Sequence, residues 1–173
     1  MGNLSLPLVR DNILFLGSKS IDVNQCDLET VRRFFGSEQK RETLSKNHLR
    51  VVEKIVFEHQ NFDRIEATLL TEKNEEPVIC SFEFFFDKEM LLRESLSIYG
   101  EPELVKILFP SGLATYAIWS INLAAEILPE GRIKSLEFLN EKHLRECGCN
   151  FCATVKGVSS HLIRADREKI VLQ

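Results

Sequence analysis

Hydrophobic and polar residues alternate through the middle of the chain, over residues 50–86. Residues 65–69 show a strict period of two, which is the pattern of a strand with one buried face. Residues 78–86 form the most apolar run, and residues 73–77 (Lys-Asn-Glu-Glu-Pro) are typical of a turn. The pattern therefore predicts a meander of antiparallel strands over this stretch.

Two short helices are also predicted, each ending at a glycine that follows an aromatic residue. Asp27 is a suitable N-cap for a helix whose apolar residues share one face, and Gly36 is a suitable C-terminal stop. A second helix is expected to begin after Asp87 and to end at Gly100. Both helices would pack an apolar face against the sheet.

Shorter apolar runs predict the remaining strands. Residues 12–16 and 21–23 read as a small hairpin, and residues 116–128 read as one long strand, straight or bent. A turn at residues 129–131 precedes a closing strand over residues 133–138. We therefore expect an α+β fold, in which a mostly antiparallel sheet is packed by two main helices, with a short C-terminal segment.

The similar ends of the two predicted helices raise the question of an internal duplication. Two copies are too few to establish a repeat, so a division of the 1–140 core into halves 1–86 and 87–140 stays open. Residues 141–173 hold most of the cysteine and two of the four histidines. They are expected to form a segment that packs on the core.

Composition narrows the class of protein more than it narrows the function. The chain has 173 residues, 44% of them hydrophobic, and a formal net charge of −4. This balance argues against nucleic-acid binding, which requires clustered Lys and Arg. No apolar run is long enough to span a membrane, and the first residues lack the pattern of a secretory signal. With an odd number of cysteines, five, we expect a cytoplasmic protein without membrane insertion.

One part of the chain carries a resemblance to known proteins. A helix ending in Tyr-Gly-Glu-Pro at residues 99–102 is followed by a strand with Trp119 and a turn at Gly131. This arrangement resembles one half of a β-lactamase-inhibitor-protein-like fold, and it is similar to small bacterial immunity proteins that neutralise a toxin. The resemblance covers residues 12–139, although residues 37–38 are Ser-Glu where the second copy has Glu-Pro.

The resemblance implies a stoichiometric protein-binding protein, an immunity-type inhibitor that occludes the active site of a cognate toxin, and not an enzyme. Its partner would be another protein, and no cofactor would be needed. Amphipathic aromatic residues anchor many protein interfaces, and acidic turns suit a basic partner. The candidate partner-binding residues are Glu75, Glu76, Tyr99, Glu101 and Glu103, whereas Trp119 is expected to pack in the core.

The densest cluster of chemically reactive residues lies near the C-terminus. Cys147, Cys149 and Cys152 stand within six residues, between His143 and His161. Thiolates and imidazoles are the usual ligands of structural zinc, so the three cysteines together with either His143 or His161 could hold a zinc ion. The spacing departs from the common pattern of two separated cysteine pairs. The alternative interpretation is that the cysteines only pack against apolar neighbours.

Two other functional classes stay open beside the inhibitor. One is a small zinc-binding enzyme or regulator built on the cysteine cluster, and the other is a secretion chaperone. Glu83 and Glu126 lie among apolar neighbours, and a buried carboxylate there would have a perturbed pKa. We interpret both as residues on the solvated side of a strand.

Overall fold

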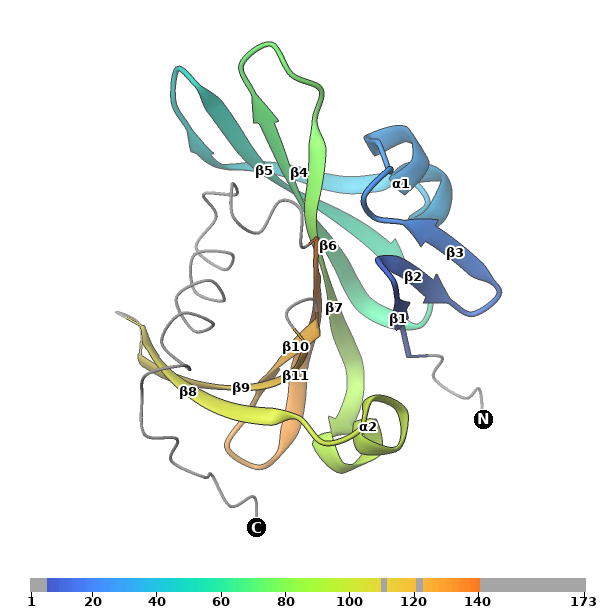
Figure 1. Ribbon diagram of the computed structural model, residues 1–173, viewed down its shortest axis with the longest axis vertical. Coiled ribbons are helices and arrows are strands. Elements are labelled where there is room, and N and C mark those ends of the chain that lie inside the picture. Colours follow the sequence, from blue (N-terminus) through green and yellow to red (C-terminus); the bar gives the residue numbers. More distant parts are fainter. Residues whose placement is uncertain (1–5, 110–111, 121–122, 141–173) are drawn as a thin grey trace.

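Strands dominate the described part of the chain, in which two antiparallel sheets are accompanied by two short helices (Figure 1). The computed structural model describes residues 6–109, 112–120 and 123–140, most of which are in strands. A three-stranded sheet is ordered β1 (Leu8–Arg10), β2 (Ile13–Leu16), β3 (Lys19–Asp22). An eight-stranded sheet is ordered β4 (Glu38–Lys46), β5 (Arg50–His59), β6 (Phe62–Glu72), β7 (Val78–Leu91), β11 (Arg132–Leu139), β10 (Leu123–Ile127), β9 (Gly112–Ser120), β8 (Glu103–Phe109). The helices are α1 (Leu28–Phe35) and α2 (Leu92–Tyr99).

The large sheet consists of two four-stranded meanders that meet at its centre. β4 to β7 form the first and β8 to β11 the second, and their last strands, β7 and β11, pair antiparallel. This pairing places Phe84 opposite Leu136 and Phe82 opposite Phe138. One helix precedes each meander, so the order of a helix and four strands occurs twice. The division into halves at residues 86 and 87 stays a prediction.

The hydrophobic core lies on one face of the large sheet. Figure 1 shows α1, α2 and the three-stranded sheet on the same side of it. The ring of Phe35, at the end of α1, lies 5.6, 5.2 and 6.1 Å from the rings of Phe57, Phe82 and Phe84, centroid to centroid. All three of these partners are fully buried. These four rings, from β5, β7 and the last turn of α1, form an aromatic cluster in the core.

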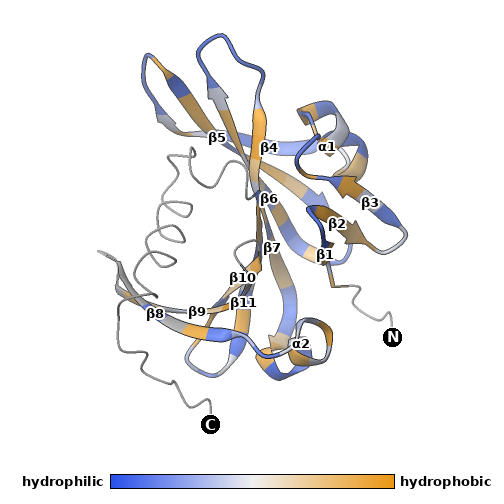
Figure 2. Cartoon of the chain, viewed as in Figure 1, coloured by the Kyte–Doolittle hydropathy of each residue, from blue (hydrophilic) through white to orange (hydrophobic). Residues whose placement is uncertain are grey.

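The predicted meander over residues 50–86 is confirmed as β5, β6 and β7. Ile65, Ala67 and Leu69 are fully buried, so the period of two in β6 does mark the core face. Figure 2 shows that the turn between β6 and β7 is hydrophilic, in agreement with the predicted turn at residues 73–77. The predicted hairpin near the N-terminus is confirmed as β2 and β3, with β1 as an additional strand.

Local sequence accounts for α1. The Oδ1 atom of Asp27 accepts hydrogen bonds of 2.7 Å from the backbone N–H and from the hydroxyl of Thr30, and these bonds lower the pKa of Asp27. The helix ends where Gly36 adopts a φ of 101° and donates its N–H to the carbonyl of Arg32. Both predicted ends of this helix are confirmed.

The second helix is shorter than predicted. It was expected after Asp87, but β7 continues to Leu91 and α2 begins at Leu92. Pairing with the start of β11 holds the last residues of β7 in the sheet. The carboxylate of Glu94 accepts a hydrogen bond of 2.7 Å from the backbone N–H of Leu91, which defines the start of the helix. Tertiary pairing therefore overrides the apolar pattern here.

The expectation of an α+β fold with two main packing helices is wrong. Two eight-residue helices accompany a sheet that is larger than predicted, because residues 38–46 and 103–109 form its edge strands. β4 is almost entirely solvent-exposed, so it lacks the apolar alternation that identifies a strand in the sequence. It pairs with β5 along its length, and a bidentate ion pair from Arg41 to Glu53 on β5, at 2.9 and 2.8 Å, adds to this pairing. Charged edge strands of this kind resist pairing with other chains.

The long strand predicted over residues 116–128 is in fact two strands. β9 and β10 pair with each other antiparallel, with Leu123 opposite Ser120 and Ala125 opposite Ala117. The alternation of apolar residues continues on both sides of the reversal. No Pro or Gly stands between the strands, so the turn signal in the sequence is weak and consists of Ser120 and Asn122 alone.

Neither helix in the described part of the chain has the length and apolar character needed to cross a lipid bilayer. Location in the cytoplasm and the absence of nucleic-acid binding stay predictions. The position of the C-terminal segment, residues 141–173, lies outside the described residues.

Candidate functional site

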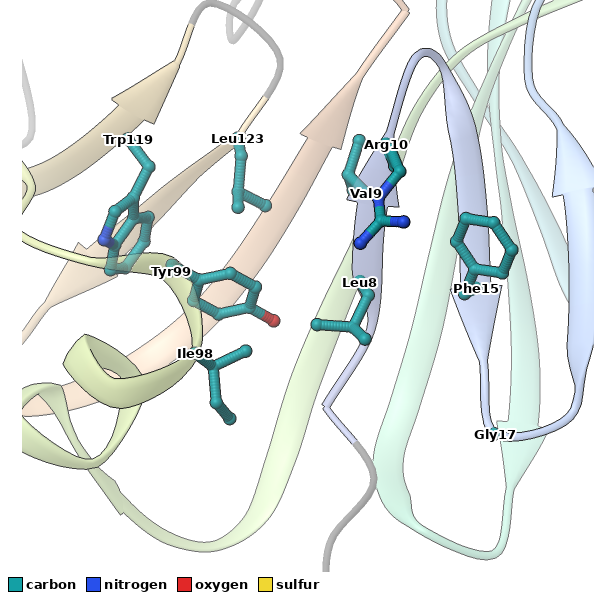
Figure 3. Close-up of a pocket in the computed structure, with 9 residues that line it drawn as sticks. All are labelled: Leu8, Val9, Arg10, Phe15, Gly17, Ile98, Tyr99, Trp119 and Leu123. Atoms are coloured by element: carbon teal, nitrogen blue, oxygen red, sulfur yellow. The ribbon is translucent and has the colours of Figure 1, made fainter.

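A groove opens between the three-stranded sheet and α2. Its volume is about 520 Å³. Figure 3 shows its lining residues as two groups, one from β1 and β2 and the other from α2, β9 and β10. The lining consists of Leu8, Val9, Arg10, Phe15, Gly17, Ile98, Tyr99, Trp119 and Leu123. Apolar and aromatic side chains predominate, as is usual for binding sites in proteins.

Two aromatic side chains are held in place on the α2 side of the groove. The hydroxyl of Tyr99 donates a hydrogen bond to the carbonyl of Pro7, which joins the end of α2 to the segment before β1. The indole N–H of Trp119 donates to the carbonyl of Gly100 at 2.8 Å. The two rings lie 5.2 Å apart, centroid to centroid. Each ring therefore has its polar group bonded to the backbone, and its apolar body lines the groove.

The way α2 ends determines the position of Tyr99 and of the Gly100 carbonyl that Trp119 binds. Gly100 adopts a φ of 81°, a conformation that favours glycine, and its N–H donates to the carbonyl of Leu96. The helix stops there, which leaves Tyr99 as its last residue, facing the small sheet (Figure 3). Burial raises the pKa of Tyr99, so its phenol stays neutral and remains a hydrogen-bond donor at neutral pH.

Among the described residues that line the groove, Arg10 on β1 alone has a charged side chain. Arg10 is exposed and forms no ion pair with any residue that the structure describes. By contrast, Arg64 on β6 is paired with Glu66 at 2.8 Å. A ligand of this groove would therefore meet an available positive charge.

Large apolar side chains are exposed at the rim of the groove. Leu8 is 48% exposed and Ile98 is 44% exposed. They lie on opposite walls, one on β1 and the other on α2 (Figure 3). Exposed apolar side chains around a pocket are typical of surfaces that bind another molecule.

The structure does not bring the five candidate partner-binding residues together. Tyr99 lines the groove, whereas Glu101 lines a separate hollow of about 430 Å³ beside α2. Glu103 is the first residue of β8. Glu75 and Glu76 lie in the turn between β6 and β7, at the end of the large sheet away from α2 (Figure 1). Their role in binding stays a prediction.

The zinc ligands proposed from the sequence, His143, Cys147, Cys149, Cys152 and His161, lie outside the described residues. Within residues 6–109, 112–120 and 123–140, no three His, Cys, Asp or Glu side chains gather in a way that could hold a metal ion. The zinc hypothesis therefore stays a prediction that rests on the sequence.

The two cysteines in the described part of the chain, Cys26 and Cys80, are buried. Burial raises the pKa of the Cys26 thiol to about 12, and this thiol donates a hydrogen bond to the carbonyl of Val23 at 3.4 Å. A thiol with such a pKa is almost entirely protonated at neutral pH, so it is a poor nucleophile and a poor metal ligand. Cys80 is buried in β7, as its apolar neighbours in the sequence predict.

Glu83 was expected on the solvated side of a strand, and the structure places it on the outer face of β7 but only partly exposed. It lies on the face of β7 opposite the core, next to Glu66 on β6, and Ser135 donates a hydrogen bond of 2.6 Å to its Oε1. Burial is the main cause that raises its pKa, Ser135 opposes the shift, and the charges of Glu66 and Glu126 add to it. Glu126 is half-buried and paired with Lys134 at 3.0 Å.

Sequence reasoning identified only part of the groove. Tyr99 was a candidate for binding, but Trp119 was assigned to the core, and Leu8 and Arg10 were not singled out. β1 has only three residues, too few to show a period of two. The available signal was the apolar pair Leu8-Val9 directly before an arginine.

The groove thus combines two oriented aromatic rings, exposed apolar side chains on both walls and one available cation. Its residues come from two distant parts of the chain, residues 8–17 and 98–123. These features suit the binding of a ligand with an apolar body and a negative charge. No protein-family model, curated protein or solved structure was found to match this chain.

Proposed function

We propose that this chain is a non-catalytic protein-binding protein, most concretely an immunity-type inhibitor that binds a cognate bacterial toxin and covers its active site. The observation that carries the proposal is the groove. Leu8 and Ile98 expose apolar surface on either side of the Tyr99 and Trp119 rings. Tyr, Trp and Arg are the residue types that contribute most to binding at protein interfaces.

Preorganisation supports the same proposal. Tyr99 and Trp119 are each held by a hydrogen bond to a backbone carbonyl, and their rings contact one another. Because these side chains are already ordered, they would lose little conformational entropy when a partner binds. An inhibitor that acts by occlusion needs a rigid surface of this kind, since it has to hold its partner without any chemical step.

The assignment to the immunity class rests on the resemblance carried by residues 99–102, Trp119 and Gly131. Two of these elements, Tyr99 and Trp119, line the groove. The resemblance therefore supports toxin inhibition as the specific form of protein binding.

The test uses the protein encoded beside the gene for this chain, purified as a candidate toxin, and measures its activity and its binding to the full chain. We expect inhibition at a one-to-one ratio. Leu8→Asp should weaken binding at least tenfold, or about 1.4 kcal/mol, because it places a charge in the apolar rim. Leu44→Asp is the matched control, since Leu44 is 47% exposed on β4 and lies outside the groove.

The emission of Trp119 provides a second measurement, because it is the only tryptophan in the chain. Occupation of the groove should change this emission to a saturable end point. The proposal fails if the neighbouring protein is neither bound nor inhibited. Protein binding at this groove also fails if Leu8→Asp and Leu44→Asp have equal effects on the affinity.

A further inference from the structure

The three residues of β1 all line the groove, although their side chains cannot share one face. Successive side chains of a strand point to opposite faces of the sheet. Leu8 is exposed, whereas Val9 packs against the hydrophobic core, and Arg10 is exposed again. The groove lies over the outer face of the small sheet, because Phe15, which also lines it, is paired with Leu8. It also touches Val9, whose side chain belongs to the other face, so it reaches the edge of β1.

That edge is not paired in the described part of the chain. β1 pairs with β2 alone, with Leu8 opposite Phe15 and Arg10 opposite Ile13. No backbone hydrogen bond joins β1 to another strand on its other side, within the residues that the structure describes. An edge strand presents backbone N–H and C=O groups that can bind one more strand. The opposite wall, with Ile98 and Tyr99, is a helix end and not a strand (Figure 3).

Charge indicates the chemistry of the occupant. Arg10 is the one charged residue in the described lining of the groove, and no described residue forms an ion pair with it. A guanidinium binds a carboxylate through two parallel hydrogen bonds, and opposite charges on neighbouring strands stabilise their pairing. The remaining positions of the groove are apolar, so the residues on either side of the carboxylate should be apolar too.

We propose that the groove binds an extended segment of a partner protein as an additional β-strand on β1, with an acidic residue beside Arg10 and apolar residues next to it. This inference rests on the proposed function and names the kind of segment recognised. Backbone hydrogen bonds to β1 provide affinity, and the contacts with Arg10, Leu8 and the Tyr99–Trp119 pair provide specificity.

The test begins with a phage-displayed library of random nonapeptides selected on the full chain. We expect enrichment of sequences in which Asp or Glu stands next to two apolar residues. Synthetic peptides made from them should change the emission of Trp119 to a saturable end point. Methylation of alternate backbone amides should weaken binding at least tenfold, because it removes the donors that pair with β1.

Charge reversal gives the matched comparison. Arg10→Glu should weaken the selected peptides at least tenfold and should favour variants in which the acidic residue is replaced by Lys. Arg33→Glu, at an exposed position on α1, should leave both affinities unchanged. Circular dichroism of both variants checks that the fold is kept, and Arg10 is an exposed edge residue whose replacement should not unfold the chain.

Several results would overturn the inference. The selected peptides could leave the emission of Trp119 unchanged, or their affinity could be insensitive to methylation of the backbone. Arg10→Glu could also bind these peptides as tightly as the unchanged protein does. Two further results would assign the groove to another occupant: an emission change caused by raising the protein concentration alone, which indicates a second copy, or binding of dodecanoate without binding of peptides.

The failure of this inference differs from the failure of the proposed function. If the neighbouring protein is inhibited in a Leu8-dependent manner but strand peptides do not bind, the groove binds protein in another way. If strand peptides bind but no neighbouring protein is inhibited, the strand inference stands and the toxin-inhibitor function falls.

Discussion

The two helices show how one local pattern leads to two different outcomes. Each has eight residues, ends at an aromatic residue followed by a glycine, and precedes a four-stranded meander. The aromatic residue of α1, Phe35, is 6% exposed and contacts three buried phenylalanines. That of α2, Tyr99, is half-buried and borders the groove. The first helix closes the core, and the second leaves a binding site open.

The difference comes from what each helix packs against. α1 contacts β3 and β5, so the small sheet and the first meander enclose its aromatic end. α2 contacts β7 and approaches the small sheet through the hydrogen bond from Tyr99 to Pro7. A tyrosine suits this position because its ring packs while its hydroxyl reaches a polar partner. The groove therefore lies beside the hydrogen bond that joins the end of α2 to the segment before β1.

The largest expected effect separates the two aromatic residues. Phe35→Ala should lower the free energy of unfolding by about 3–5 kcal/mol, because it leaves a cavity among Phe57, Phe82 and Phe84. Tyr99→Ala should cost no more than about 2 kcal/mol, since the side chain is only half-buried and the loss is mainly one hydrogen bond and one ring contact. Urea unfolding measures both. Equal losses would place Tyr99 in the core and contradict the comparison.

An intermediate effect is expected at the two helix ends. Gly36 and Gly100 have φ values of 101° and 81° with ψ near −165°, a region open almost only to glycine. Gly36→Ala and Gly100→Ala should each lower stability by about 1–3 kcal/mol through backbone strain, because no atom lies within 4 Å of an added Cβ.

The same two variants also distinguish the end of α1, which lies in the core, from the end of α2, which borders the groove. Gly100→Ala should also change the emission of Trp119, whose indole is bonded to the carbonyl of Gly100. Gly36→Ala should leave the emission of the folded protein as it is. An emission change of equal size in both variants would show that the two helix ends are not independent.

The smallest effect concerns β7 and β11, the pair of strands that joins the two meanders. Because folding raises the pKa of Glu83, its carboxyl group binds a proton more tightly in the folded state than in the unfolded state. Stability should therefore fall as the pH rises from the ordinary carboxyl pKa to the raised one. Glu83→Gln should lack this fall and gain up to about 1 kcal/mol at neutral pH.

Urea unfolding at a series of pH values between 4 and 7 measures this difference, with Glu101→Gln at an exposed position as the control. The control should follow the pH profile of the unchanged protein. If Glu83→Gln follows that profile too, the charge of Glu83 does not affect the stability of the protein where β7 pairs with β11.

Some features of the fold and the site are predictable from short stretches of sequence. Asp27 and Gly36 mark the ends of α1 because capping depends on residues three or four positions apart. Tyr99 was a candidate for binding because tyrosine is amphipathic. The edge strand β4 was missed, since its residues are exposed and have no apolar alternation. The reversal between β9 and β10 was missed because no Pro or Gly stands between them.

The sequence by itself determined the antiparallel strands β5 to β7, the N-terminal hairpin and the whole of α1. These depend on apolar period and on hydrogen bonds between near neighbours. Only the tertiary structure decided that β7 pairs with β11, that the fold is mostly sheet, and that a groove lies between β1 and α2. These features join distant residues, such as Tyr99 with Pro7 and Phe82 with Phe138, whose contacts no local pattern encodes.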